Sequence, residues 1–150
     1  RAFDNDAFST TATGTPARLG HVRAIHRRKT GALLRVAVRV GGLVGGASAA
    51  SLRRLSAYGE HVGLAFQIAD DLLDTAECGD ADGRTDRALG KATYPAAVGM
   101  AGARRAAARE RDAAVAALAL FGPRAEPLRR IARDVVARAT GSAGPGAAGA

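Results

Sequence analysis

The sequence predicts an all-α protein of one domain, and three observations lead to this prediction. The chain has 150 residues, of which 47% are hydrophobic, so it can bury a core. Only 4% of the residues are aromatic and none is Trp, so Ala, Leu and Val must fill that core, which favours packed helices over a sheet. Apolar residues also recur every three to four positions, which is the spacing of a helix.

The first expected helix follows an irregular segment. Residues 1–17 are polar and contain Gly14 and Pro16, so we interpret them as an N-terminal loop. Helical spacing then continues from about Arg18 to Val44, where the stretch GGLVGG ends or bends the helix. The apolar positions of this helix are Leu19, Val22, Ile25, Leu33, Val36 and Val40.

The later helices are separated by breaks rich in glycine. Ser48 is a suitable N-cap for the second helix, and Gly122-Pro123 interrupts the last helical region. We expect the helical domain to occupy residues 18–139. In order, the expected elements after the first helix are a helix from Ser48 to Thr75, a loop over 76–92, helical pieces between about Tyr94 and Ala139, and a flexible tail over 140–150.

Charge and composition exclude some classes of function. The net charge is +8, but the arginines are scattered, no nucleic-acid recognition motif is present and aromatic residues for base stacking are few, so we do not expect nucleic-acid binding. No run of 18 apolar residues predicts a membrane span. The single cysteine, Cys78, cannot form an internal disulfide, which favours a reducing compartment, and we predict a cytoplasmic protein.

The stretch FQIADDLLD at residues 66–74 places three aspartates in a helix that is otherwise apolar. At about 100° per residue, Gln67, Asp70, Asp71 and Asp74 fall in one sector of the helix, and apolar side chains cover the rest. We therefore expect a buried helix whose acidic stripe faces a cavity. Seven of the fourteen acidic residues lie between Asp70 and Asp86, although the chain as a whole is basic.

Three neighbouring carboxylates need a compensating partner. They repel one another, and the macrodipole disfavours anions in the C-terminal part of a helix. A hard divalent cation such as Mg²⁺ takes carboxylate oxygens and can bridge to substrate phosphates. The alternatives are a solvated acidic face and a salt bridge to one of the many arginines. The apolar surroundings and the neighbouring Gln67 favour a metal site formed by Asp70, Asp71 and Asp74.

Three segments together resemble one enzyme family. IHRRKTGALL, YGEHVGLAFQIADDLLD and GKATYP occur in this order, at spacings similar to those of the C-terminal half of the trans-isoprenyl diphosphate synthases. The resemblance covers roughly residues 18–139. It implies the C-terminal portion of an isoprenoid-synthase-type helical bundle around a deep cavity, usually in a homodimer. It also implies Mg²⁺-dependent joining of an allylic diphosphate to isopentenyl diphosphate.

The same resemblance implies roles for individual residues. Asp70, Asp71 and Asp74 would bind Mg²⁺, and through it the allylic diphosphate. Thr30 would place its oxygen near the developing carbocation. The diphosphate would be contacted by Lys29, Gln67, Arg84 and Lys91. We interpret His26 as a histidine on a helix face and not as a catalytic base, and Tyr94-Pro95 as the start of the next helix.

This sequence departs from the family pattern in several ways. It lacks the family's first aspartate-rich motif, and Arg84 in GDADGRTD stands near the place where the family has a lysine. Two functions therefore compete. One is a prenyl diphosphate synthase of which this is the C-terminal part, with little activity by itself. The other is a half-length relative or partner subunit that binds Mg²⁺-diphosphate.

Overall fold

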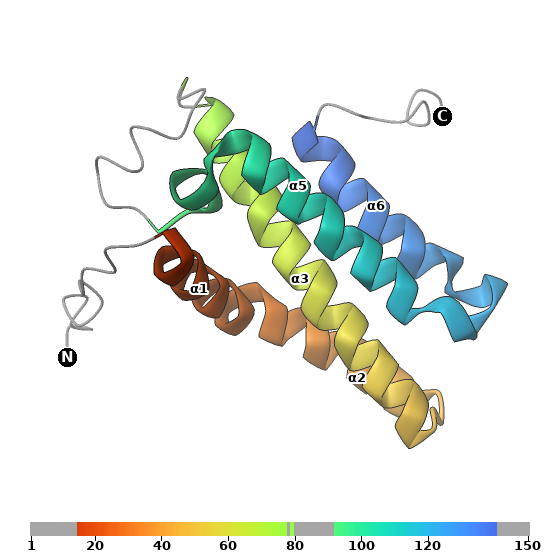
Figure 1. Ribbon diagram of the computed structural model, residues 1–150. Helices are drawn as coiled ribbons and strands as arrows, with labels where there is room; N and C mark the ends of the chain where they lie inside the picture. The colour runs from red at the N-terminus through yellow and green to blue at the C-terminus, as the bar shows by residue number, and fades with distance from the viewer. Residues whose placement is uncertain (1–14, 78, 80–91, 141–150) are drawn as a thin grey trace, which may run out of the picture.

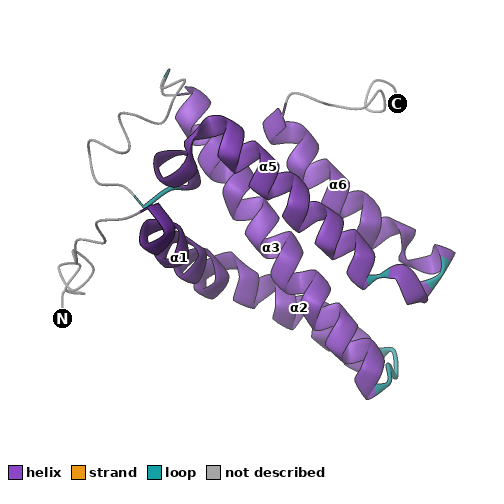
Figure 2. Cartoon of the chain, viewed as in Figure 1, coloured by secondary structure: helices purple, strands orange, loops and turns teal. Residues whose placement is uncertain are grey.

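The computed structural model describes residues 15–77, 79 and 92–140, and every regular element within these residues is a helix (Figures 1 and 2). The predicted all-α fold is therefore confirmed. The elements are α1 (Thr15–His26), a π-helical segment η2 (Arg27–Gly31), α2 (Ala32–Val44), α3 (Ala49–Glu77), α5 (Tyr94–Ala117), the 3-10 turns η3 (Ala119–Phe121) and η4 (Pro123–Ala125), and α6 (Glu126–Thr140).

Helix α3 forms the centre of the bundle. Figure 1 shows it between α1 and α2 on one side and α5 and α6 on the other, and it packs against all four. Two apolar clusters fill the contacts of α3 with its neighbours. One contains Val22, Leu64, Ala65, Ile68, Leu72, Tyr94, Ala103, Ala106, Ala107 and Val136, and the other contains Leu55, Tyr58, Val62, Ala114, Leu118, Ala125 and Ala132. Both clusters are rich in alanine, as the composition predicted.

The first helical region is one continuous run with a change of pitch. It begins at Thr15, about three residues earlier than expected, and ends at Val44, as expected. The π-helical segment Arg27–Gly31 inside it was not predicted. It lies where α1 and α2 meet α3, because Gly31 packs directly on Gly63: a Cβ on Gly63 would stand 2.6 Å from the Gly31 Cα. Single π-turns inside α-helices occur frequently at functional sites.

The remaining boundaries agree closely with the expected ones. The Ser51 N–H donates to the Ser48 hydroxyl at 3.2 Å, which confirms Ser48 as a cap for α3. Tyr94 begins α5, and the chain breaks at Gly122-Pro123 before α6. Helix α5 contains a kink that was not predicted: Gly99 has φ +72°, a conformation open mainly to glycine, so residues 94–98 form a separate first turn.

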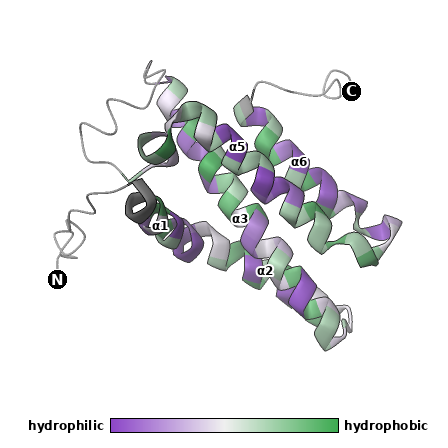
Figure 3. Cartoon of the chain, in the orientation of Figure 1, coloured by the Kyte–Doolittle hydropathy of each residue, from purple (hydrophilic) through white to green (hydrophobic). Residues whose placement is uncertain are grey.

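Helix α2 contacts the bundle on one side only. None of its residues, all of which the structure describes, is buried. Its exposed large apolar side chains are Leu33, Val36, Val40, Leu43 and Val44, with exposed fractions of 52–85%. Figure 3 shows hydrophobic segments along this outer helix as well as along α3 and α5. Within the described residues, no helix is long and apolar enough to cross a bilayer.

Candidate functional site

The three sequence segments that carry the resemblance meet near the C-terminal end of α3. His26 is the last residue of α1, Asp71 lies in the last turns of α3, and Tyr94 is the first residue of α5. The Tyr94 backbone N–H donates to Asp71 Oδ2 at 2.8 Å, and His26 Nε2 lies 3.5 Å from the same oxygen. The His26 and Tyr94 rings stack with their centroids 5.6 Å apart. We call these three residues the His26 cluster.

The His26 imidazole is buried and neutral. Burial, and to a smaller degree the charge of Lys29, lower the pKa of His26 from 6.5 to about 4. The carboxylate of Asp71 favours a charged imidazole, but at 3.5 Å its attraction does not outweigh the cost of burial. His26 Nδ1 is buried without a hydrogen-bond partner among the described residues. A neutral ring that carries its proton on Nε2 satisfies this geometry best, because Nδ1 is then only an acceptor.

The three aspartates do not share one environment. Asp70 and Asp74 are exposed, whereas the side chain of Asp71 is 14% exposed and is directed toward Tyr94 and His26. Among residues 15–77, 79 and 92–140, no three His, Cys, Asp or Glu side chains are grouped so that they could hold a metal ion. The three carboxylates were expected to form one stripe. In the structure Asp70 and Asp74 are exposed, whereas Asp71 is bound to other parts of the chain.

The exposed pair fits a hydrated Mg²⁺. Asp70 and Asp74 lie one helical turn apart, where two side chains can reach the same ion. Mg²⁺ usually binds through one or two carboxylates, keeps several waters and completes its coordination with substrate phosphates. Two exposed hard oxygen donors suit such an ion. The metal-binding roles of the three aspartates stay predictions.

The other predicted site residues divide between the π-helical segment, α3 and residues outside the described part. Lys29 is exposed and Thr30 half-buried on η2, next to the Gly31–Gly63 contact. Gln67 is 5% exposed and lies inside the bundle. Arg84 and Lys91 lie outside the described residues. The structure therefore brings Lys29 and Thr30 onto the helix crossing beside α3, and the roles of all five residues stay predictions.

A second polar group joins the same three helices, and sequence reasoning missed it. Glu110 of α5 accepts from Arg23 Nη2 at 2.8 Å and pairs with His61 Nδ1 at 2.7 Å. Burial raises the pKa of Glu110, but the His61 hydrogen bond and the charges of His61, Arg23 and Arg27 outweigh it, so the pKa is lowered from 4.5. We call Arg23, His61 and Glu110 the Glu110 cluster. Nothing local in the sequence marks Glu110, because its partners are 49 and 87 residues away.

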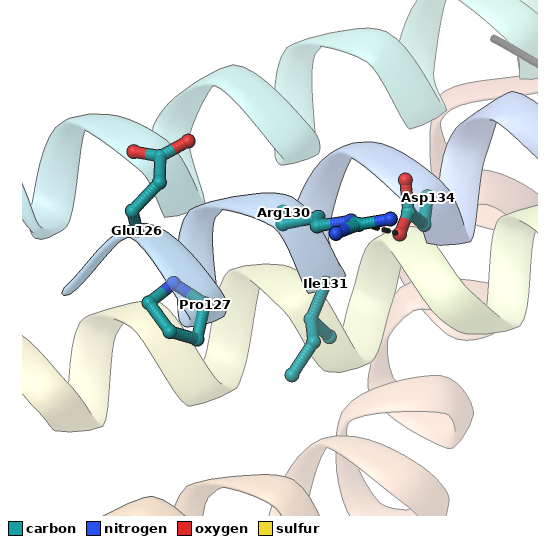
Figure 4. A pocket seen from close by; sticks show the side chains of 5 residues that line it. All are labelled: Glu126, Pro127, Arg130, Ile131 and Asp134. Carbon is teal, nitrogen blue, oxygen red and sulfur yellow. Dashed lines mark ion pairs between the residues drawn. The ribbon is translucent and has the colours of Figure 1, made fainter. Parts of the chain in front are cut away.

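A surface hollow of about 560 Å³ lies on α6, away from both clusters (Figure 4). Arg130 and Asp134 at its rim form an ion pair with Nε and Oδ2 3.6 Å apart. It shares no residue with the aspartate segment. Its lining residues are Glu126, Pro127, Arg130, Ile131 and Asp134.

Comparison with known proteins identifies the family. The model of the family described as "Polyprenyl synthetase" matches residues 6–118, which is more than half of the chain. The chain belongs to the polyprenyl synthetase family. It is 41% identical over 104 residues to the farnesyl diphosphate synthase of Geobacillus stearothermophilus, and 45% identical over 106 residues to that of Escherichia coli (strain K12). Each alignment covers 67% of this chain and 35% of the relative.

Two further similarities extend over more of the chain. Geranylgeranyl pyrophosphate synthase 9 of Arabidopsis thaliana, a chloroplastic protein, is 36% identical over 124 residues, which are 80% of this chain and 34% of that protein. A solved structure assigned as a farnesyl-diphosphate synthase of Marinomonas sp. MED121 superposes with a TM-score of 0.66 and 34% identity. The superposition covers 79% of this chain and 40% of the solved chain. This polyprenyl synthetase chain therefore spans about a third of the length of the curated relatives it matches.

Proposed function

We propose that this polyprenyl synthetase chain contributes the second aspartate-rich half of a trans-prenyl diphosphate synthase site. The observation that supports this most is the meeting of the three motif segments at one end of α3, where His26, Asp71 and Tyr94 contact one another. Beside this meeting point Lys29, Asp70 and Asp74 are exposed to solvent. A cation and two carboxylates at one helix end suit a Mg²⁺-diphosphate ligand.

The proposed reaction condenses an allylic diphosphate with isopentenyl diphosphate. The allylic C–O bond breaks and the diphosphate leaves with the electron pair. The double bond of isopentenyl diphosphate then forms the new C–C bond to the allylic cation, and a proton is lost. Bound Mg²⁺ would supply neutralisation of the charge that develops on the leaving diphosphate.

The chain's own residues would bind and orient the substrate. Lys29 would hold the diphosphate by charge, and Gln67, Arg84 and Lys91 would add further contacts to it. Thr30 would turn its oxygen dipole toward the allylic cation. The names of the relatives favour farnesyl or geranylgeranyl diphosphate as the class of product. We also propose a homodimer and a cytoplasmic location, as in the sequence-based prediction.

A second candidate function is a partner subunit with little activity of its own. The exposed apolar face of α2 favours it. On this proposal the 150 residues bind Mg²⁺-diphosphate but do not convert an allylic substrate. Steady turnover of allylic and isopentenyl diphosphate by the 150-residue chain would exclude the partner-subunit function and leave the synthase.

Calorimetry with a non-hydrolysable allylic diphosphate analogue tests the proposed function. We expect binding that requires Mg²⁺ and weakens at least about tenfold in Asp70→Asn/Asp74→Asn. Asp112→Asn is the matched control, because Asp112 is an exposed helical aspartate that forms an ion pair with its neighbour Arg111. If a folded wild-type chain does not bind the analogue, or if the control weakens binding as much as the double variant, the proposed function fails.

A further inference from the structure

Asp71 differs from the two nearby aspartates in its exposure and in its contacts. Its side chain is 14% exposed, whereas Asp70 and Asp74 are exposed. Its Oδ2 accepts from the Tyr94 N–H at 2.8 Å, and its backbone oxygen accepts from the Thr75 hydroxyl at 2.7 Å. A carboxylate committed to a backbone donor and to a buried ring is poorly placed to follow a metal ion.

The contacts of Asp71 connect α3 with the end of α1 and the start of α5. The first turn of α5 is short, because it ends at the kink at Gly99. Asp71 accepts from the Tyr94 N–H of this turn, and the N-cap Thr93 accepts from the Ala96 N–H. The same Oδ2 lies 3.5 Å from Nε2 of His26, which is 5% exposed and stacks on Tyr94. The π-helical segment with Lys29 begins immediately after His26.

We propose that Asp71 is a positioning residue: it clamps α5 and His26 to α3, and leaves cation binding to Asp70 and Asp74. This inference rests on the proposed function for the role of the pair, whereas the clamp itself rests only on contacts. The clamp fixes the start of the Lys29 segment relative to α3. Lys29 is then held beside the carboxylate pair, so that a diphosphate can contact both.

Thermal unfolding of Asp71→Ala and Asp71→Asn tests the clamp. The alanine variant loses the acceptor for Tyr94 N–H, and we expect its Tm to fall by about 3–6 °C. The asparagine side chain has the same length and keeps an acceptor oxygen without the charge, so the Tm of Asp71→Asn should stay close to that of wild type. In Asp70→Asn and Asp74→Asn, Tm should stay unchanged or rise slightly, because like charges near a helix C-terminus are removed.

Binding of Mg²⁺ with inorganic pyrophosphate, measured on the same variants below their Tm, tests the division of roles. Asp70→Asn and Asp74→Asn should each weaken binding by about tenfold or more, whereas Asp71→Asn should remain within about twofold of wild type. If Asp71 were a direct metal ligand, Asp71→Asn would bind Mg²⁺ and pyrophosphate more weakly than wild type, while its Tm would stay unchanged.

A double-variant cycle between His26 and Asp71 separates a clamp from two independent contacts. We expect the Tm loss in His26→Ala/Asp71→Ala to be smaller than the sum of the two single losses, because both variants release the same contact. Additive losses would show that His26 is not part of the clamp and would contradict the proposal.

The remaining outcomes show which of the two proposals fails, the positioning role of Asp71 or the proposed function. Equal Tm values for Asp71→Ala and wild type, no rescue by asparagine, or a tenfold loss of binding in Asp71→Asn would each overturn the positioning role. If wild type does not bind Mg²⁺-pyrophosphate, the proposed function and the metal role of the pair fail together. The Tm series still decides the clamp in that case.

Discussion

The His26 cluster and the Glu110 cluster join the same three helices, but they do so with different chemistry. Glu110 is hydrogen-bonded to two basic side chains that are each more than a third exposed, at 42% and 36%. In the His26 cluster the imidazole is 5% exposed and neutral, and its Nδ1 has no hydrogen-bond partner in the described part of the chain. A satisfied ion pair near the surface suits a structural role, whereas an incompletely satisfied buried polar group occurs more often at functional sites.

The comparison teaches that a charged residue in a motif can be held by contacts within the protein itself. Asp71 is part of DDLLD, yet it contacts the protein in the same way as Glu110, through defined donors on other helices. Asp70 and Asp74, which flank it, are exposed. Four predictions test the helix contacts around the two clusters, and they follow in order of decreasing effect.

Gly63→Ala should destabilise the chain most, because Gly63 packs directly on the backbone of Gly31. The new Cβ would stand 2.6 Å from the Gly31 Cα and 3.1 Å from the Gly31 nitrogen, both of which are backbone atoms that cannot rotate away. The α3 crossing with η2 must then widen, and we expect a loss of about 3 kcal/mol in the free energy of unfolding, measured with urea.

Gly41→Ala is the matched control for this substitution. A Cβ at Gly41 meets nothing within 4 Å, so the change should raise stability by about 0.5–1 kcal/mol through helix propensity. Equal effects of the two substitutions would show that the Gly31–Gly63 approach does not limit the packing of these helices.

Glu110→Ala should come second, with a loss of about 1–3 kcal/mol. The substitution removes two hydrogen bonds to charged or polar groups, and the partial exposure of Arg23 and His61 reduces the penalty of leaving them unpaired. Chemical unfolding measures the loss. Glu60→Ala removes a surface pair with Arg35, in which both side chains are almost half exposed, and should change stability by less than about 0.5 kcal/mol. If Glu60→Ala lost as much unfolding free energy as Glu110→Ala, the Glu110 cluster would stabilise the chain no more than a surface ion pair.

The sequence predicted the helices well because their signals are local. Apolar spacing, the Ser48 cap and the Gly122-Pro123 break each act within a few residues, and each lies where the structure has it. Asp70, Asp74 and Lys29, which the family motifs single out, are exposed in the structure.

The sequence could not predict features that depend on distant partners. The π-helical segment Arg27–Gly31 exists where two glycines, 32 positions apart, let the helices approach closely. The division of the aspartates depends on Tyr94, which lies 23 residues beyond Asp71. A helical wheel places Asp71 beside Asp70 on the same sector, and only the packing of α5 distinguishes them.

Tyr58→Phe should cost about 1 kcal/mol and provides a neutral reference for both clusters. The buried Tyr58 hydroxyl donates to the Leu128 carbonyl at 2.8 Å and links α3 to α6, and burial raises the pKa of Tyr58 to about 12. The substitution keeps the ring and removes one uncharged hydrogen bond. A cost above that of Glu110→Ala, measured by urea unfolding, would show that the charged cluster contributes less than a single neutral bond.

The smallest effect is a difference in acid sensitivity between wild type and Glu110→Gln. The pKa of Glu110 is lower in the folded chain than its ordinary 4.5, so the folded state binds fewer protons on this group than the unfolded state does. Its stabilisation is therefore fully present above pH 4.5 and is lost as the pH falls through the folded pKa. Unfolding free energies measured from pH 7 to pH 3 should decline more steeply below pH 4.5 in wild type than in Glu110→Gln, and the two curves should run parallel above that pH. Parallel curves throughout would mean that Glu110 titrates alike in both states, so that its bonds to Arg23 and His61 do not favour the charged carboxylate.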